Sequence, residues 1–338
     1  MSGKPGERIR AYFGIGYSGE NNVERRLMDL KRAKTVKRLG WLVGFAGFAY
    51  LFLFSLSQVN FSISELIEYW PVFRDALGEF FPITTYFGVI PFIDFGQYWQ
   101  FITVEQPVQN GTSFTEAALT TLAIGFAGTA LGVPGALLFG VLGSERVTPF
   151  PFNFIFRGVM STIRSIPALV WAIIYIPLGG LSPFTATLAI GTDTIGNLGR
   201  LFTDALEEVE DGPIEAIEST GANRPQTIVF GMLSQVFTPF IAWTMYILEI
   251  NVRIAVTMGL IGAGGIGGIL NTQQGLFAYT NMMATIIVIF VLVVSVEMIS
   301  QRTRSYLRGD GEDHGGFFQH LIDLIRGFPQ RMSESAWR

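Results

Sequence analysis

The sequence contains no cysteine, which excludes disulfide bonds, iron–sulfur clusters and thiolate-bound metals. Histidine is scarce as well: the two copies, His314 and His320, both lie in the polar C-terminal tail, where a catalytic or metal-binding role is not expected. The phosphate-binding sequence GxxxxGKS/T occurs nowhere in the chain. We therefore expect a chain that is not an enzyme, hydrolyses nothing by itself and binds no cofactor or metal.

Charge is the second scarcity. Only 15% of the 338 residues are charged, whereas soluble domains carry about a quarter. Hydrophobic residues make up 49% of the chain and the mean hydropathy is +0.41. The net charge of −4 does not suit a general nucleic-acid binder. These values predict an integral membrane protein whose main partner surface is the lipid bilayer.

Five long uncharged runs support this prediction, because a membrane-spanning helix needs about 20 apolar residues. They cover residues 39–64, 117–144, 165–192, 225–248 and 254–296. Gly- and Pro-rich turns divide the runs further, and none of them alternates as a barrel strand would. We predict an all-α polytopic protein with six transmembrane helices, at about 41–58, 117–142, 155–177, 184–203, 233–257 and 278–299.

The lysine and arginine bias predicts the orientation. Residues 4–38 contain ten Lys/Arg, whereas residues 59–113 contain only Arg74. Positive residues mark the cytoplasmic side, so both termini are predicted to be cytoplasmic. The predicted parts are a basic N-terminal segment (1–40), a first span (41–58), an extracytoplasmic aromatic-rich segment (59–113), a transmembrane core (114–300) with a cytoplasmic connection (204–232), and a cytoplasmic tail (301–338).

Three segments outside the spans have helical or interfacial character. Residues 23–38 form a cationic helix candidate that would lie along the inner leaflet, with a solvated tail as the alternative. Residues 80–104 are rich in aromatics but broken by proline and glycine, which favours an interfacial structure on the outer surface. Residues 317–328 suggest a further amphipathic helix in the tail.

The stretch Gly262-Ala263-Gly264-Gly265-Ile266-Gly267 satisfies the dinucleotide-binding pattern G-x-G-x-x-G. That function requires a preceding strand and a soluble βαβ unit, whereas this stretch lies between two predicted spans. We interpret it as a closely packed re-entrant turn, in which glycine lets backbones approach.

The cytoplasmic connection contains the most informative segment, residues 212–225. We predict a short helix at 214–220, ended by Gly221 as a left-handed C-terminal cap and by Pro225. A short helix held away from the bilayer suits docking into a groove of another protein. An ordinary solvated connector is the alternative.

This segment resembles the EAA loop of the permease subunits of ABC importers. The resemblance implies the type I permease fold of that family. Glu215, Ala216, Gly221 and Leu233 match that pattern, whereas Ile217, Gly231 and Ser234 depart from it. In the family the loop forms a coupling helix that presses on a separate ATPase subunit, which binds the ATP. The resemblance therefore implies coupling residues at Glu215, Ala216, Ile217, Gly221 and Ala222.

Residues 164–172, 194–202, 249–253 and 259–267 are similar to the permeases of phosphonate importers, so the resemblance covers about 115–300. Asp193 stands where the family has a histidine. The resemblance implies a homodimeric permease in the cytoplasmic membrane that carries phosphonate, phosphite or phosphate. Its other partners would be ABC ATPase subunits and an extracytoplasmic solute-binding protein.

Ionisable side chains inside the predicted spans are candidates for the translocation pathway: Arg253, Asn251, Glu249 and Arg164. Glu249 and Arg253 are four residues apart on one helical face, so they are predicted to pair. Either the pair locks helices together, or Arg253 attracts an oxyanion with its planar guanidinium. For Arg164, pathway, gate and snorkelling roles all stay open.

Other functions also fit these features. The cargo of an importer permease is usually set by the binding protein, so an amino acid or a quaternary amine is a near alternative. An ion-coupled secondary transporter would carry inverted repeats and acidic sites at the midplane, and the sequence shows no convincing repeat. A membrane signalling or scaffold protein is a third possibility.

Overall fold

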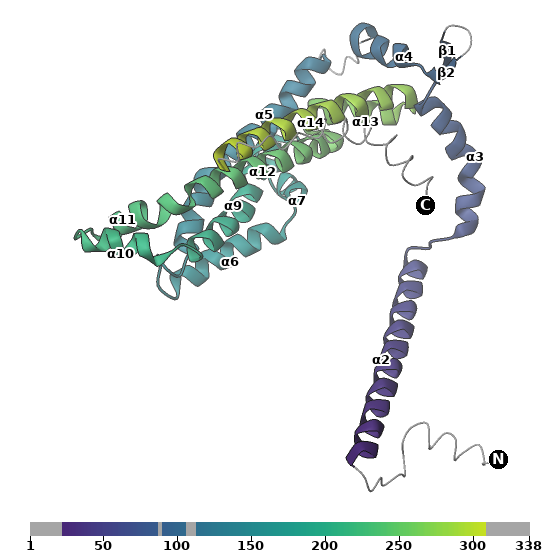
Figure 1. Ribbon diagram of the computed structural model, residues 1–338. Coiled ribbons are helices and arrows are strands. Elements are labelled where there is room, and N and C mark those ends of the chain that lie inside the picture. The colour runs from purple at the N-terminus through teal and green to yellow at the C-terminus, as the bar shows by residue number, and fades with distance from the viewer. Residues whose placement is uncertain (1–21, 87–89, 106–112, 309–338) are drawn as a thin grey trace, which may run out of the picture. The chain divides into compact units, whose positions relative to one another are not determined.

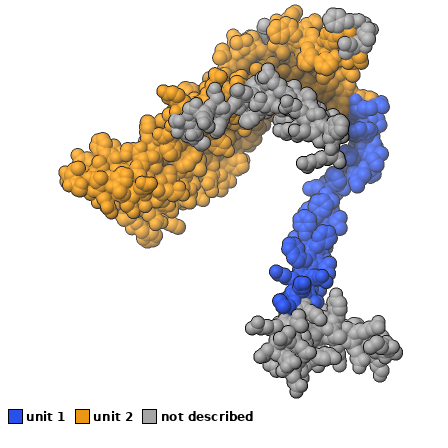
Figure 2. Space-filling model, in the orientation of Figure 1, with its two compact units in different colours: residues 1–74 blue, residues 75–338 orange. Residues whose placement is uncertain are grey.

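The computed structural model describes residues 22–86, 90–105 and 113–308. The predicted tail helix at 317–328 lies outside these ranges, and so does the part of the basic N-terminal segment before residue 22. The chain divides into two compact units, residues 1–74 and residues 75–338, which are distinguished by colour in Figure 2.

The first unit consists mainly of helix α2, Asn22–Gln58. This helix runs without a break through the predicted boundary at residue 40, so the basic segment and the first span share one helix. Its apolar part, Arg32–Gln58, is long and apolar enough to cross a membrane. Its aromatic side chains, such as Trp41 and Phe45, are exposed, as expected for a surface that faces lipid.

The elements after α2 are mostly helices (Figure 1). In chain order they are α3 (Ile63–Phe80), β1 (Ile83–Tyr86), β2 (Ile90–Ile93), α4 (Phe95–Gln100), η1 (Phe101–Glu105), α5 (Phe114–Gly143), α6 (Phe152–Ser165), α7 (Ala168–Ile174), α8 (Ile176–Gly179), α9 (Pro183–Glu207), α10 (Asp211–Ser219), α11 (Arg224–Gln226), η2 (Thr227–Leu233), α12 (Ser234–Met258), η3 (Gly259–Ala263), α13 (Gly265–Gly275) and α14 (Tyr279–Arg308), where η denotes a π-helix.

The strict all-α prediction is wrong in one place, because β1 and β2 form a small antiparallel hairpin. Ile83 is paired with Ile93 and Tyr86 with Ile90. Strand β1 reads Ile-Thr-Thr-Tyr, and β-branched and aromatic residues favour the extended backbone. The hairpin lies within the predicted aromatic-rich segment 59–113.

Four of the six predicted spans coincide with helices that are long and apolar enough to cross a membrane, among the residues that the structure describes. These are Arg32–Gln58, Phe114–Gly143, Arg224–Ala263 and Tyr279–Leu307. The predicted span at 155–177 is interrupted between α6 and α7, where Pro167 follows an extended Ile166. The predicted span at 184–203 is the single 25-residue helix α9, whose hydropathy is lowered by Asp193 and Arg200.

Helix α9 nevertheless lies in the interior of the second unit, where α5, α6, α7 and α12 pack around it. Glycines of α5 allow the closest approach. A Cβ on Gly132 would lie 2.5 Å from Cβ of Thr194, and one on Gly128 would lie 2.5 Å from Cγ2 of Ile190. Since real Cβ atoms do not approach so closely, these two positions require glycine.

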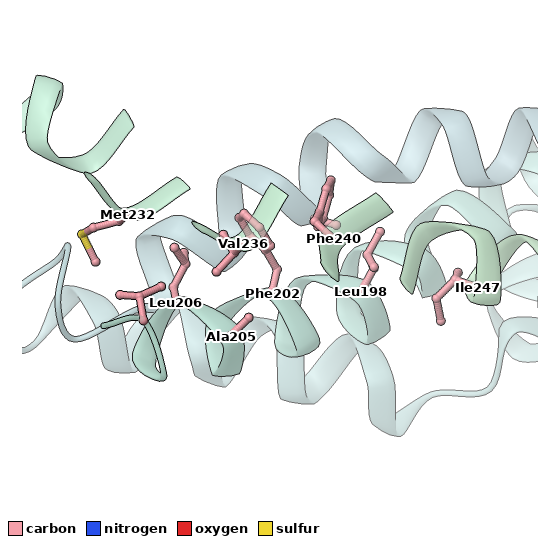
Figure 3. Packing of buried hydrophobic residues seen from close by; sticks show 10 residues of the cluster. Leu198, Phe202, Ala205, Leu206, Met232, Val236, Phe240 and Ile247 are labelled. Atoms are coloured by element: carbon pink, nitrogen blue, oxygen red, sulfur yellow. The ribbon is translucent and has the colours of Figure 1, made fainter. Parts of the chain in front are cut away.

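A hydrophobic cluster joins α9 to α12 along one half of the bundle (Figure 3). The rings of Phe202 and Phe240 lie 4.4 Å apart, centroid to centroid. Leu198, Leu206 and Val236 are buried beside them. These contacts fix the start of α12, which follows the predicted coupling segment.

The glycine-rich stretch between α12 and α13 is a compact turn, as predicted. Gly262 has φ of +107°, which favours glycine. A Cβ on Gly267 would collide with the carbonyl oxygen of Val256, so the backbones there are in direct contact. The hydroxyl of Thr121 accepts a hydrogen bond from the amide of Ile266 at 2.9 Å and holds the turn against α5.

Candidate functional site

The predicted coupling helix is present as α10, Asp211–Ser219, three residues earlier at its start than predicted. The side chains of Glu215, Ala216 and Glu218 are exposed and together define the outer face of the helix. Gly221 has φ of +81° and its amide donates to the carbonyl of Glu218 at 2.9 Å. This confirms the predicted left-handed cap, which reverses the chain toward α11.

The opposite face of α10 packs on η2. Ile214 and Ile217 are half-buried there. A Cβ on Gly231 would lie 3.3 Å from Cα of Ile214, so the lack of a side chain at residue 231 allows this contact. Two of the three departures from the family pattern, Ile217 and Gly231, are therefore neighbours that pack against each other. Of the other predicted coupling residues, Gly221 is exposed and Ala222 is half-buried.

Helices α10 and α11, joined by the turn at Gly221, form a helical hairpin. Two polar contacts tie this hairpin to the loop between α5 and α6. Arg146 forms an ion pair with Asp211 at 2.6 Å, at the start of α10. On the returning leg, Arg224 donates to the carbonyl of Val147 at 3.0 Å. The loop thus contacts both legs of the hairpin.

The base of the hairpin is closed by Glu210 and Gln235. The amide of Glu210 donates to the side-chain carbonyl of Gln235 at 3.1 Å, and the side-chain amide of Gln235 donates back to the carbonyl of Glu210 at 3.2 Å. This reciprocal pair joins the residue before α10 to the first turn of α12. Nearby, Arg157 of α6 forms an ion pair with Glu207 at the end of α9.

A second charged cluster joins α12 to α14. The carboxylate of Glu249, with an 8% exposed side chain, accepts from Arg253 at 2.5 Å and pairs with Arg304 at 3.4 Å. Arg253 also pairs with Glu297 at 3.4 Å. The predicted Glu249–Arg253 pair is therefore present, and α14 supplies one further charge of each sign. The four charges balance, which lowers the cost of placing them among apolar helices.

Asn251 lies on a different side of α12 and is buried, with 1% of its surface exposed. Its side-chain amide donates to the hydroxyl of Thr129 at 2.8 Å and to that of Thr194 at 2.9 Å. It therefore connects α5, α9 and α12, and in this structure it lines no open surface. Its polar atoms hold three helices in one arrangement.

Arg164, in the last turn of α6, is exposed, and its side chain makes no ion pair or hydrogen bond within the described part of the chain. The helix backbone beside it crosses α9 closely, because a Cβ on Gly196 would lie 3.0 Å from the amide nitrogen of Arg164. Asp193 is buried in α9, and its backbone carbonyl accepts from the side chain of Asn197 at 3.2 Å.

Sequence reasoning missed several of these residues. Arg304 and Glu297 complete the cluster around Glu249, and Thr129 and Thr194 complete the one around Asn251. A threonine on an apolar helix does not by itself predict a contact with another helix, because its hydroxyl often donates to a backbone carbonyl of its own helix. Glu297, a lone carboxylate in the last predicted span (278–299), is the signal that could have revealed a counter-charge for Arg253.

The described residues thus combine a helical core that contains candidate membrane spans with a short exposed helix, α10, held outside that core. Residues 132–304, just over half of the chain, match the family described as binding-protein-dependent transport system inner membrane component. The chain therefore belongs to this family.

Among curated proteins, the chain is similar to the phosphate-import permease protein PhnE of Mycolicibacterium smegmatis, with 33% identity over 58% of this chain and 37% of the relative. It is also similar to the putative phosphite transport system permease protein HtxE of Stutzerimonas stutzeri, with 36% identity over 48% of this chain and 64% of the relative. The matched regions thus span less than two thirds of the length of these two relatives.

Among solved structures, the fold is similar to a chain of the MetNI methionine ABC transporter in an inward-facing conformation. The TM-score is 0.52 at 21% identity, over 57% of this chain and 95% of that chain. This likeness concerns the fold alone.

Proposed function

We propose that this protein is the membrane-spanning permease subunit of an ATP-driven ABC importer for phosphonate, phosphite or phosphate. The observation that carries the proposal is α10, a short helix with an exposed face. Its start at Asp211 and the returning leg at Arg224 both contact the loop between α5 and α6. Family membership supports the class of transporter. The phosphate- and phosphite-related names of the similar permeases support the cargo.

The polar contacts of the α10–α11 hairpin with its surroundings suggest how a movement of the ATPase would be transmitted to the helical core. Glu215 and Ala216 would contact the ATPase, while Gly221 fixes the turn and Ala222 supports it. Force on α10 would pass through Asp211 and Arg146 to the ends of α5 and α6. The Glu210–Gln235 pair would pass it to α12. In this mechanism the chain supplies the pathway and the coupling, and the ATPase supplies the energy.

The proposed assembly contains two copies of this chain with six spans each, two ATPase subunits and an extracytoplasmic solute-binding protein. In the proposed topology α6 with α7, and α9, are the third and fourth spans. Both termini are cytoplasmic, the segment 59–113 is outside, and the membrane is the cytoplasmic one. The chain itself holds no cofactor, and the ATPase subunits bind ATP.

Arg164 and Arg253 are the two candidates for a cationic contact with an anionic cargo, because guanidinium groups bind phosphate and phosphonate oxygens with two hydrogen bonds. Arg164 is exposed and unengaged among the described residues, which suits this role. Arg253 is half exposed, at 49%, but two carboxylates occupy its guanidinium. We therefore propose that Arg253, together with Glu249, chiefly locks α12 to α14.

Substitution of Arg253 distinguishes its two roles. If Arg253 lines the pathway, Arg253→Ala will lower uptake while the complex assembles normally. If Arg253 locks the helices, the same variant will lose assembly or unfold at a lower temperature. Size-exclusion chromatography and thermal unfolding of the purified complex decide between them, with Arg164→Ala as the comparison, since Arg164 has no lock to lose.

The function itself is tested by purification and reconstitution. A stoichiometric ATPase should copurify under gentle extraction, and proteoliposomes should take up cargo only with ATP and the binding protein present. Absence of the ATPase would favour a secondary transporter or a scaffold. Binding assays on the solute-binding protein with phosphate, phosphite, alkylphosphonates, amino acids and quaternary amines identify the cargo. Selective binding of an organic cation or an amino acid would overturn the proposed cargo.

A further inference from the structure

Helix α3, Ile63–Phe80, is a two-faced helix that no part of the proposed transport mechanism uses. Five of its apolar side chains recur at helical spacing along one side, and each of the five is more than half exposed. They are Ile63, Leu66, Ile67, Trp70 and Phe73. At about 100° per residue, its four carboxylates fall on the opposite side. They belong to Glu65, Glu68, Asp75 and Glu79.

The N-terminal end of α3 lies next in sequence to the end of a candidate span. The residues 59–62 alone separate it from the end of α2 at Gln58, where that apolar helix would leave the bilayer. Four residues reach at most about 14 Å, so Ile63 lies close to the surface at which α2 ends.

The C-terminal end of α3 is fixed to the start of another candidate span. The hydroxyl of Thr280 in α14 donates to the carbonyl of Glu79 at 2.8 Å, and the rings of Phe80 and Tyr279 lie 5.1 Å apart. The phenol of Tyr98 also donates to the carbonyl of Phe80. Burial, with the Asp94 carboxylate adding to it, raises the pKa of the Tyr98 phenol, so this donor keeps its proton.

A helix with both ends at span termini either crosses the bilayer or lies along one surface. The 18 residues of α3 are about 27 Å long, which approaches the thickness of the hydrocarbon core. Four carboxylates and Arg74 in that length make crossing too costly. Lying along the surface instead places the apolar side toward the acyl chains and the carboxylates toward water.

We propose that α3 is an in-plane helix embedded in the lipid interface, and that it links the end of α2 to the start of α14 along one leaflet. Trp70 on the apolar side suits this depth, because indole rings favour the interface. The inference requires only that α2 and α14 cross the membrane. In the proposed topology the leaflet is the outer one.

The absence of cysteine from the chain makes the test direct, because single-cysteine variants need no prior substitutions. Nitroxide labels are placed at Leu66→Cys and Ile67→Cys on the apolar side. Their neighbours Glu65→Cys and Glu68→Cys serve as matched controls at the same position along the helix. The full chain is reconstituted with its ATPase partner in vesicles of phosphatidylethanolamine and phosphatidylglycerol.

Collision with oxygen, which partitions into lipid, is compared with collision with a water-soluble nickel chelate. We expect the oxygen-to-nickel ratio to be several-fold higher at the two apolar positions than at the two acidic ones. High nickel access at all four positions would overturn the proposal in favour of a solvated helix. Labels at Leu66 and Ile67 that are shielded from both reagents would overturn it in favour of packing on another protein. Copurification of the ATPase with each variant keeps these outcomes separate from failure of the transport proposal.

Discussion

The interior polar contacts and the contacts around α10 are both built from charged and amide side chains, but in different surroundings. Glu249 and Asn251 are buried, and each joins α12 to other helices. Asp211, by contrast, has a 73% exposed side chain, and its ion pair with Arg146 lies in solvent. Buried polar contacts are costly to break, whereas exposed ion pairs contribute little to stability. We infer that the first set determines whether the core assembles and the second determines whether it responds to the ATPase.

The sharpest test of the interior set is Glu249→Ala. Removing this carboxylate leaves Arg253 and Arg304 without their shared partner. Breaking a buried pair in this way costs about 3–5 kcal/mol, and we expect the low end because Arg253 is half exposed. Thermal unfolding of the detergent-purified protein measures the loss, with the exposed Glu215→Ala as control. An unchanged unfolding temperature together with lost uptake would assign Glu249 to the pathway instead.

The next largest effect is expected at the crossing of α5 and α9. Gly132→Ala places a Cβ 2.6 Å from the carbonyl oxygen of Gly191, which is backbone and cannot move aside alone. Overpacking of this kind costs about 1–3 kcal/mol. Gly158→Ala on α6 is the matched control, because nothing lies within 4 Å of its new Cβ. Equal unfolding temperatures for the two variants would contradict the close packing of α5 on α9.

At the coupling end, Gly221→Leu is expected to uncouple transport from ATP hydrolysis. A Cβ at Gly221 meets nothing within 4 Å, so the cost arises from the positive φ alone, about 1–2 kcal/mol. Gly221→Asn should retain more coupling, because asparagine tolerates this conformation better. The readout is ATPase activity stimulated by the cargo-loaded binding protein. Normal stimulation in Gly221→Leu would argue against a role of the turn in coupling.

The smallest effect on stability is expected from Asp211→Asn, which removes the exposed ion pair with Arg146. Such pairs contribute about 0–1 kcal/mol, and the exposure of Asp211 favours the lower value. Transport per ATP hydrolysed should nevertheless fall, because the loop between α5 and α6 loses one of its two contacts with the hairpin. Unchanged coupling would show that Arg224 alone is a sufficient tether, and the double variant with Arg224→Ala would then test that contact.

Local features of the sequence predicted local features of the structure. Long uncharged runs located four of the helices that can cross a membrane, and Gly221 was predicted as a left-handed cap. The pair Glu249–Arg253 followed from helical spacing. In each case the interacting groups lie within a few residues of one another, so helix geometry alone relates them.

Contacts between distant segments could not be predicted in this way. Asn251 meets Thr129 and Thr194 only after three helices have packed, and nothing local marks those threonines. The pairing of Arg146 with Asp211 likewise depends on how α5 and α10 are arranged. The β1–β2 hairpin was not predicted, because it lies within the segment 59–113, whose aromatic composition indicated a structure at the membrane interface. Gly231, which departs from the family pattern, is explained by the close approach of Ile214.

The polarity of α9 has a consequence for how the protein is made. A single Asp or Arg near the middle of a spanning helix opposes insertion by about 2.5–3.5 kcal/mol, and in the proposed topology α9 brings Asp193 and Arg200 into the membrane. We expect that α9 does not partition into lipid by itself during synthesis. Since α5 leaves the ribosome first, its glycine-lined surface would already be available when α9 is synthesised, and α9 could pack against it. The two helices would then insert into the bilayer together. The glycines of α5 that allow close packing in the mature core would also determine whether α9 enters the bilayer.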